Sequence, residues 1–326
     1  MKKVLFASTA LALSAGVAAA DVRLSGDARM GLQYNSANVV TTTIEKRFTL
    51  NIDGSTTTDG GVTLGARLRI RSDENTGSNT NGARVFARFG GLTVAAGNIL
   101  GAIESMPNLY GPVTPLQMTG NGFHSMITNI DRGAGKGGVA GRQYFGWDAY
   151  SSRGNAGTAS GDGIEVIYTM GDFTFHVSYS ADSLGGVAGG GNVRTAAYGA
   201  YKFSGWTLAI GIQDSNVLPN DAEDILAATL SGKVGNFDVG LGYAQTGAGA
   251  NKVDKVALNV GVTLANGLGL VAHVANQNHS DALVTNPTTF GIGARYGLGG
   301  GAFISGGIQT TERGATRGDI GLSFSF

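Results

Sequence analysis

Within each segment of the N-terminal part of the chain, the arginine residues lie an even number of positions apart, so they could form a cationic surface on one face. Arg67, Arg69 and Arg71 are two residues apart, and further arginines share the same expected face of the neighbouring segments. Rings of arginine and lysine favour anions, whereas rings of aspartate and glutamate favour cations. Three acidic residues, Asp27, Glu45 and Asp53, are expected on the same face and would offset part of this charge. The arginines of this face are Arg23, Arg29, Arg47, Arg67, Arg69, Arg71, Arg84 and Arg88.

No other group of residues has the spacing of a catalytic or cofactor site. The stretch DRGAGKGG at 131–138 lacks the spacer of a phosphate-binding loop, and Gly137 stands where a serine or threonine must bind magnesium. The stretch GIGARYG at 291–297 misses the third glycine of a dinucleotide fingerprint. The four histidines show no metal-ligand spacing, and the chain contains no cysteine. The sequence therefore predicts neither an enzyme nor a metal site.

The segments that carry the arginines alternate between polar and apolar residues. In DVRLSGDARMGLQY, at 21–34, the even positions are apolar or small and the odd positions are mainly polar or charged. This period of two predicts β-strands with one apolar face and one wet face. About sixteen such segments follow to the C-terminal GDIGLSFSF, most with room for the ~9–11 residues of a tilted membrane strand.

The arginine-rich face determines which face of each strand contacts lipid and which faces the lumen. Placing Arg67, Arg69 and Arg71 in lipid would cost ~2–4 kcal/mol for each side chain near the bilayer midplane. The arginine face must therefore line a wet lumen, and the apolar face must contact lipid. Because an open sheet edge is forbidden in lipid, the sheet must close on itself. Lys46 has outward parity near a strand end, where its side chain can extend to the interface.

The connections alternate between short and long. Short turns with glycine or asparagine, such as 90–91 and 171–172, alternate with longer polar loops, such as 72–82 and 181–192. The turn at 53–61 is the exception, because it is longer than the other turns. Aromatic residues also cluster at both expected ends of the apolar face, as in the interfacial girdles of membrane barrels. These features predict an all-β transmembrane barrel of the outer-membrane type.

The first 20 residues have the pattern of a secretory signal peptide, with Lys2 and Lys3 before an apolar run and a small-residue cleavage site. The alternative is an uncleaved transmembrane helix. We predict a signal peptide at 1–20 and a single barrel domain at 21–326. Loss of the two lysines from the balanced 23 basic and 23 acidic residues would leave a charge of −2. This near balance gives no reason to expect nucleic acid as a partner.

The segment at 98–160 breaks the alternation and is far too long for a hairpin loop. It contains apolar and aromatic residues, including Ile99, Met106, Tyr110 and Trp147, which a disordered loop would lack. We predict that it folds back into the barrel and narrows it. The alternative is a disordered external loop.

Four stretches carry a family resemblance: DVRLSGDARMGLQYN, GNILGAIESMPNLYG, FGIGARYGLGGGAFISGGIQ and GDIGLSFSF. They resemble the general-diffusion porins of the Rhodobacter type, in the Gram-negative porin family. The resemblance implies a sixteen-stranded antiparallel transmembrane β-barrel that forms a homotrimer in outer-membrane lipid. It implies a long third loop folded into the lumen, and passive diffusion of small hydrophilic solutes and ions. The location implied is the outer membrane of a Gram-negative bacterium.

The resemblance also implies a constriction at which acidic loop residues face an arginine cluster on the barrel wall. Carried onto this sequence, the wall cluster comprises Arg29, Arg47, Arg67, Arg69, Arg84 and Arg88. The corresponding loop carboxylates are Glu104, Asp131 and Asp148. Family members that bind calcium there make calcium a candidate ligand, whereas the acid-poor segment at 98–160 predicts no cofactor.

The balance of charges predicts a weak preference for anions, since the wall arginines outnumber the neighbouring acids and 98–160 adds Arg132, Lys136, Arg142 and Arg153. The alternative is that the wall arginines pair locally with carboxylates and leave no net preference.

Two rival functions remain open on the sequence. One is a structural or adhesive barrel with a plugged lumen, which binds a partner through its external loops. The other is a membrane-embedded hydrolase, which would rely on Ser178 and His176, two residues apart on one strand face. Such a hydrolase would also need a partner that orients the histidine. We expect His176 and His273 to be wet residues of the lumen wall.

Overall fold

The computed structural model describes residues 21–73, 77–110, 127, 129–131, 142–144, 162–181, 193–215, 224–246, 253–278 and 287–326. The signal peptide predicted at 1–20 lies outside these residues. Within the described part of the chain, no helix is long and apolar enough to cross a membrane.

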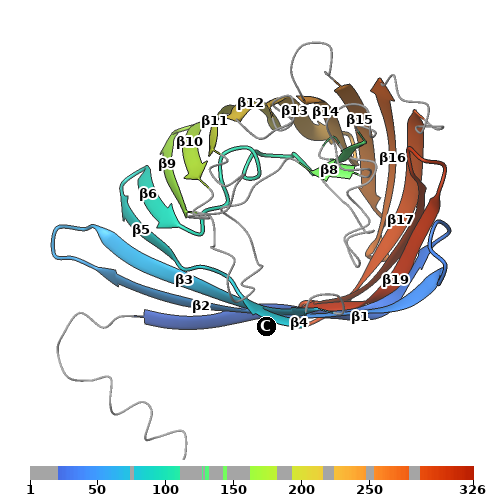
Figure 1. Ribbon diagram of the computed structural model, residues 1–326, viewed down its shortest axis with the longest axis horizontal. Helices are drawn as coiled ribbons and strands as arrows, with labels where there is room; N and C mark the ends of the chain where they lie inside the picture. Colours follow the sequence, from blue (N-terminus) through green and yellow to red (C-terminus); the bar gives the residue numbers. More distant parts are fainter. Residues whose placement is uncertain are drawn as a thin grey trace, which may run out of the picture.

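All described strands except two short ones form one closed antiparallel barrel (Figure 1), in which neighbours in sequence are neighbours in the sheet. Its strands are β1 (Asp21–Asn35), β2 (Thr42–Thr57), β3 (Thr63–Asp73), β4 (Gly77–Thr80), β5 (Arg84–Phe89), β6 (Leu92–Gly97), β9 (Asp162–Met170), β10 (Phe173–Ala181), β11 (Val193–Phe203), β12 (Trp206–Ser215), β13 (Ile225–Val234), β14 (Phe237–Thr246), β15 (Val253–Thr263), β16 (Leu268–Asn278), β17 (Thr288–Gly299), β18 (Ala302–Thr310) and β19 (Thr316–Ser325). The ring closes where β1 pairs with β19.

The strand count agrees with the predicted sixteen once two short pieces are taken together. Both β4 and β5 pair with β3, so they are two parts of one interrupted barrel strand. Strands β7 (Asn129–Asp131) and β8 (Arg142–Tyr144) form a separate two-stranded sheet. The prediction of a sixteen-stranded antiparallel barrel is therefore confirmed.

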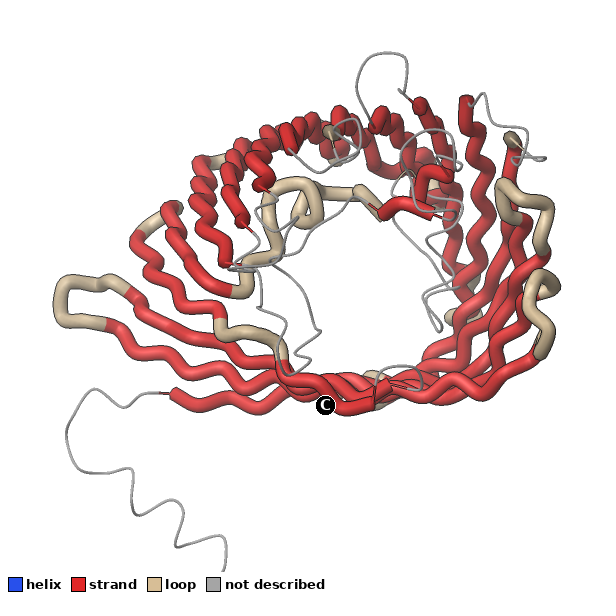
Figure 2. The backbone as a smooth tube through the Cα atoms, in the orientation of Figure 1, coloured by secondary structure: helices blue, strands red, loops and turns tan. Residues whose placement is uncertain are grey.

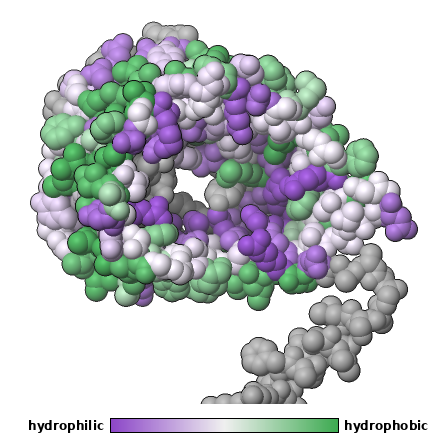
Figure 3. Space-filling view, turned by 180° about the vertical axis from the view of Figure 1, so that it is seen from behind, coloured by the Kyte–Doolittle hydropathy of each residue, from purple (hydrophilic) through white to green (hydrophobic). Residues whose placement is uncertain are grey.

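The two faces of the barrel differ in polarity as the alternation predicts. Outward side chains such as Leu24, Met30 and Phe290 are exposed and apolar. The interleaved positions carry polar groups such as Thr49 and Gln213, which are buried on the inner side. Figure 3 shows hydrophilic residues gathered around the central opening and hydrophobic residues over the outside. This outer surface is suited to lipid.

The short connections are tight turns with glycines in the left-handed region. Gly90, Gly171 and Gly205 all have positive φ, a conformation that glycine adopts without a Cβ penalty. The turn predicted at 53–61 begins later than expected, because β2 continues to Thr57. The remaining residues, 58–62, still make it longer than the other short turns, such as 90–91 and 171–172. The polar sequence there pairs with β3, which has its own lumen-facing polar residues.

Candidate functional site

A stretch of chain directly after β6 lies inside the ring of strands (Figures 1 and 2). We call residues 99–110 the inner segment. Gly97 has a φ of 94°, and a Cβ there would lie 2.2 Å from the carbonyl oxygen of Ala83. The N–H of Asn98 donates to that same carbonyl at 2.9 Å. A glycine is therefore required where the chain leaves the wall, and the predicted infolding of the third loop is confirmed for this part.

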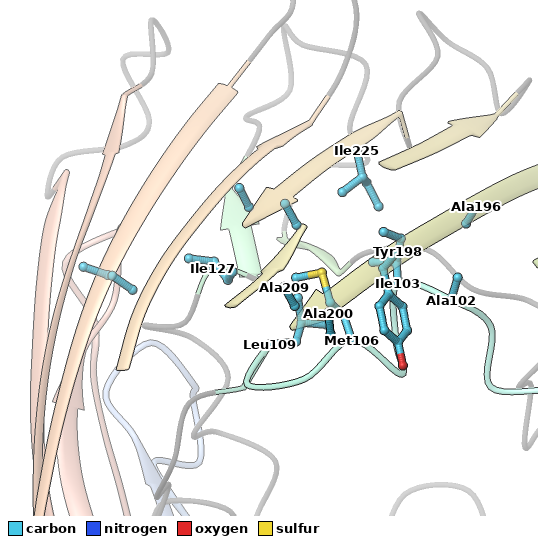
Figure 4. Close-up of a cluster of buried hydrophobic side chains, with 14 of the residues drawn as sticks. Ala102, Ile103, Met106, Leu109, Ile127, Ala196, Tyr198, Ala200, Ala209 and Ile225 are labelled. Atoms are coloured by element: carbon cyan, nitrogen blue, oxygen red, sulfur yellow. The ribbon is translucent and has the colours of Figure 1, made fainter. Parts of the chain in front are cut away.

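Apolar side chains hold the inner segment against one side of the barrel. Ile103, Met106 and Leu109 are buried in one cluster, together with Ile127. Figure 4 shows Met106 and Leu109 among small residues of the strands. We call these residues the small-residue wall, which comprises Ala196, Ala200, Ala209, Gly211, Ala227, Gly242, Ala244 and Ala257.

The contact of the small-residue wall with the inner segment and with Ile127 leaves no room for larger side chains. A Cβ added at Gly211 would lie 2.9 Å from both Cδ1 of Ile103 and Sδ of Met106. One added at Gly242 would lie 3.0 Å from Ile127. The hydroxyl of Thr229 also donates to the carbonyl oxygen of Pro107 at 2.7 Å. The size of these wall residues thus sets how far the inner segment stands into the lumen.

The predicted wall arginines lie on β1, β2, β3 and β5. Among the described residues, at least three of them pair with carboxylates. Arg29 contacts Glu45 at 2.5 Å. The next two pairs are Arg67 with Asp53 at 2.5 Å and Arg84 with Glu165 at 2.6 Å. Local pairing, the alternative to a net preference, therefore describes part of the cluster. We call the set Arg29, Arg47, Arg67, Arg69, Arg71, Arg84 and Arg88 the arginine wall.

Neutral groups contact other members of the arginine wall. Nε of Arg71 donates to Thr49 and Nε of Arg88 donates to Thr93, each at 3.3 Å. The side-chain oxygen of Asn81, in the orientation that satisfies both residues, accepts from Nη2 of Arg69 at 2.6 Å. Such hydrogen bonds orient a guanidinium group without cancelling its charge.

An aromatic ring separates two of the arginines. The guanidinium carbons of Arg84 and Arg88 lie 5.4 and 5.5 Å from the centre of the Phe86 ring. These distances allow cation–π attraction. The ring lies over Gly65, where an added Cβ would be 2.4 Å from it.

A cavity of about 320 Å³ lies between the arginine wall and the inner segment. Arg67, Arg69 and Arg84 line it on one side, and Leu100 and Ser105 of the inner segment line the other. The structure thus brings half of the predicted arginine cluster to a cavity beside the inner segment.

The predicted loop carboxylates have separate places. Glu104 lies in the inner segment and accepts a hydrogen bond from the Tyr110 hydroxyl. Burial raises the pKa of Glu104 to about 7, although the bond from Tyr110 lowers it in part. The backbone of Asp131 pairs with that of Arg142 between β7 and β8. Asp148 lies outside the described residues.

One residue of the site, Glu165 of β9, went unrecognised in the sequence, and the surroundings of His176 on β10 differ from the expectation. Glu165 is 2% exposed and contacts Arg84, His176 and the inner segment. The expectation that His176 and His273 are wet is wrong, because both are buried. Their lumen parity was correct, but facing the lumen is not the same as facing water. The available signal was a lone acidic residue in the apolar strand GIEVIYTM.

A second buried ion pair joins β15 to the turn between β18 and β19. Nζ of Lys255 lies 2.5 Å from Oε1 of Glu312, and both side chains are almost fully buried. Sequence spacing offers no signal for this pair, because 57 residues separate its members.

The described residues do not fit a calcium site. Calcium takes six to eight oxygen ligands, in which carboxylates are prominent. Within the described part of the chain, no three histidine, aspartate or glutamate residues gather to hold a metal ion. The oxygens of Glu165 are taken by Arg84, His176 and Gly101.

Comparisons with known proteins agree with this architecture. The model of the Gram-negative porin family matches residues 7–316 of the chain. A porin of Fuscovulum blasticum is 29% identical over 325 residues, covering 94% of this chain and 100% of that protein. A porin of Rhodobacter capsulatus is 26% identical over 330 residues, with the same two coverages.

Solved structures share the fold. A triple mutant of the Rhodopseudomonas blastica porin superposes with a TM-score of 0.77 at 24% identity, and the match covers 94% of this chain and 100% of that one. The barrel, its apolar outer surface and its narrowed lumen therefore occur together with a family match over most of the chain. This chain belongs to the Gram-negative porin family, and it is a passive diffusion channel of the outer membrane.

Proposed function

We propose that this channel passes small hydrophilic solutes and ions with a weak preference for anions. The observation that carries the preference is the cavity lined by Arg67, Arg69 and Arg84 beside the inner segment. A solute in this part of the lumen meets guanidinium groups directly. Rings of such groups favour anions.

The arginine wall keeps an excess of positive charge in spite of its ion pairs. On the first four barrel strands, eight arginines share the lumen parity with five acidic residues, which are Asp21, Asp27, Glu45, Asp53 and Asp73. Glu165 on β9 adds one more carboxylate. The local ion pairs reduce the field in the lumen but leave it positive on this side.

The same proposal includes how the protein is delivered and assembled. Residues 1–20 act as a cleaved signal peptide, 21–326 form one barrel domain, and 98–160 form the constriction loop. The channel works as a homotrimer in outer-membrane lipid, needs no cofactor and catalyses no reaction. Glu104, Asp131 and Asp148 contribute the acidic groups of the loop. The chain's exposed apolar outer residues support the lipid contact.

The test is the reversal potential of the purified protein in a planar bilayer under a potassium chloride gradient. We expect stepwise conductance with a potential that indicates a preference for chloride. A preference for potassium would contradict the proposed charge balance, and an absence of conductance would indicate a plugged barrel.

A matched pair of variants assigns the preference to the lumen. Arg88→Gln removes an exposed charge of the arginine wall, and we expect it to shift the reversal potential toward cations. Lys46→Gln removes the same charge from an outward position and should leave the potential unchanged. Equal shifts in both variants would show that the lumen charges do not control selectivity.

A further inference from the structure

The carboxylate of Glu165 joins three parts of the molecule at the point where the inner segment begins. Oε1 accepts from Nε and Nη2 of Arg84 on β5, at 2.9 and 2.6 Å. Oε2 lies 3.1 Å from Nε2 of His176 on β10. The same oxygen accepts from the N–H of Gly101 at 3.4 Å.

The neighbouring residues strengthen this attachment. The N–H of Ala102 donates to Oγ of Ser178 at 2.8 Å. The His176 ring is fully buried and lies edge-on to Tyr198, with ring centres 5.4 Å apart. The start of the inner segment is thus bound by polar contacts to β9 and β10, upstream of the apolar contacts of Ile103.

We propose that Glu165 is a positioning residue of the channel. Its carboxylate holds the start of the inner segment and the guanidinium of Arg84 in fixed positions relative to each other. Because both line the same cavity, one side chain sets the width of the opening and the place of a charge at its edge. This inference rests on the channel function and not on the proposed preference for anions.

The chemistry of the site requires a carboxylate. An ionised carboxylate only accepts hydrogen bonds and offers about four lone-pair directions, which Arg84, His176 and Gly101 can use together. An amide in its place would direct an NH₂ group either at Arg84 or at the N–H of Gly101. Bonds to a charged acceptor are also stronger than bonds to a neutral one.

The primary test is Glu165→Gln, with Glu312→Gln as the matched control. Both residues are 2% exposed, and each forms an ion pair with a basic residue. The basic partner of Glu312 is Lys255, whereas Glu165 contacts Arg84 and Gly101. Single-channel recordings would measure the frequency of brief closures, and heat-induced unfolding would measure barrel stability. We expect closures to become severalfold more frequent in E165Q only, although both variants lose some stability. Equal closure frequencies in E165Q, E312Q and the unmodified channel would overturn the proposal.

A disulfide would distinguish the effect of Glu165 on the position of the inner segment from the effect of its negative charge. The chain has no cysteine, so Ala102→Cys with Ser178→Cys adds the only pair, at the site of the Ala102–Ser178 hydrogen bond. In the E165Q background, we expect the disulfide to restore steady currents, and a reducing agent to abolish the effect. E165Q also removes a negative charge, so its reversal potential should shift toward anions, and this shift should remain when the disulfide has formed.

Frequent closures that persist with the disulfide formed would show that Glu165 does not act by position. If mass spectrometry shows that the disulfide does not form, the comparison of E165Q with E312Q still decides the question.

Discussion

The arginine wall and the small-residue wall face each other across the same lumen, but one presents charged side chains to a cavity and the other is covered by protein. On the arginine wall, inward side chains are long and charged, and Arg67, Arg69 and Arg84 line a cavity. On the small-residue wall, inward side chains are alanine and glycine, and the inner segment covers them. Both follow the same alternation along the strands. The difference shows that the residue types on the lumen face of a barrel strand depend on whether water or another segment of the chain lies against them.

The physical basis of the difference is hydration. An inward position that contacts water must be polar, whereas one that is covered can be apolar and must be small enough to admit its cover. Burial of a large aliphatic side chain such as Ile103 or Leu109 contributes ~1.5–3 kcal/mol. These side chains belong to the inner segment, so the wall provides the space and the inner segment provides the apolar volume.

The largest effect should follow from filling the small-residue wall. Gly211→Leu places a side chain where Ile103 and Met106 now lie, so we expect the inner segment to move into the lumen and the unitary conductance to fall severalfold. Overpacking of this kind costs ~1–3 kcal/mol of stability. Single-channel recording and heat-induced unfolding measure the two effects.

The control for this prediction is Gly54→Leu on β2, where an added Cβ meets no other heavy atom within 4 Å. It should conduct like the unmodified channel. If Gly211→Leu also shows normal conductance, the small-residue wall does not determine the position of the inner segment, and its contrast with the arginine wall is wrong.

A smaller effect is expected from changing one charge on the arginine wall. Asp53→Asn leaves Arg67 without its carboxylate partner, and the reversal potential should shift toward anions. Arg67 is 55% exposed at its side chain, so loss of the pair should change stability by only ~0–1 kcal/mol. Arg67→Gln is the counterpart and should shift the potential toward cations. Shifts of the same sign in both variants would contradict the assigned role of this wall.

The smallest expected effect is a dependence of the anion preference on pH. It tests whether a charge on the inner segment offsets the charge of the arginine wall. Burial raises the pKa of Glu104 to about 7, so the carboxyl is mainly neutral below this pH and mainly ionised above it. Ionisation adds negative charge to the lumen, so anion preference should weaken as the pH rises through this value.

Reversal potentials measured on either side of neutrality would check the prediction for Glu104. Glu104→Gln should remove this part of the pH dependence, and Tyr110→Phe should move it to higher pH because the hydrogen bond that favours the ionised form is lost. An unchanged pH profile in Glu104→Gln would assign the titration to another group.

Sequence reasoning could predict the barrel because strand alternation and the cost of arginine in lipid are local properties. Arg67, Arg69 and Arg71 orient their strand without any knowledge of the rest of the chain. The same logic did not identify the small-residue wall, although Ala196, Ala200 and Ala209 carry the lumen parity. Small inward residues indicate a covered wall only when a covering segment is known.

The candidate site was harder to predict than the fold because its contacts join distant parts of the chain. Glu165 is 81 residues from Arg84, and no motif relates the two positions. Glu104 could be assigned to the loop, but its bond to Tyr110 depends on the local path of the inner segment. Pairings of this kind are set by three-dimensional packing and not by spacing.

The pairing of β1 with β19 has a consequence for the order of assembly. Other pairings of the barrel join strands that are close in sequence or separated only by the constriction loop, so hairpins can add one after another. The β1–β19 pairing spans nearly the whole chain, and such distant contacts form slowly because of their loop-closure entropy. Until it forms, two strand edges remain unpaired, which the hydrocarbon of a bilayer does not tolerate. Closure of this seam is therefore the step that should limit the rate of insertion, and substitutions along it should slow the appearance of channels more than they change the finished pore.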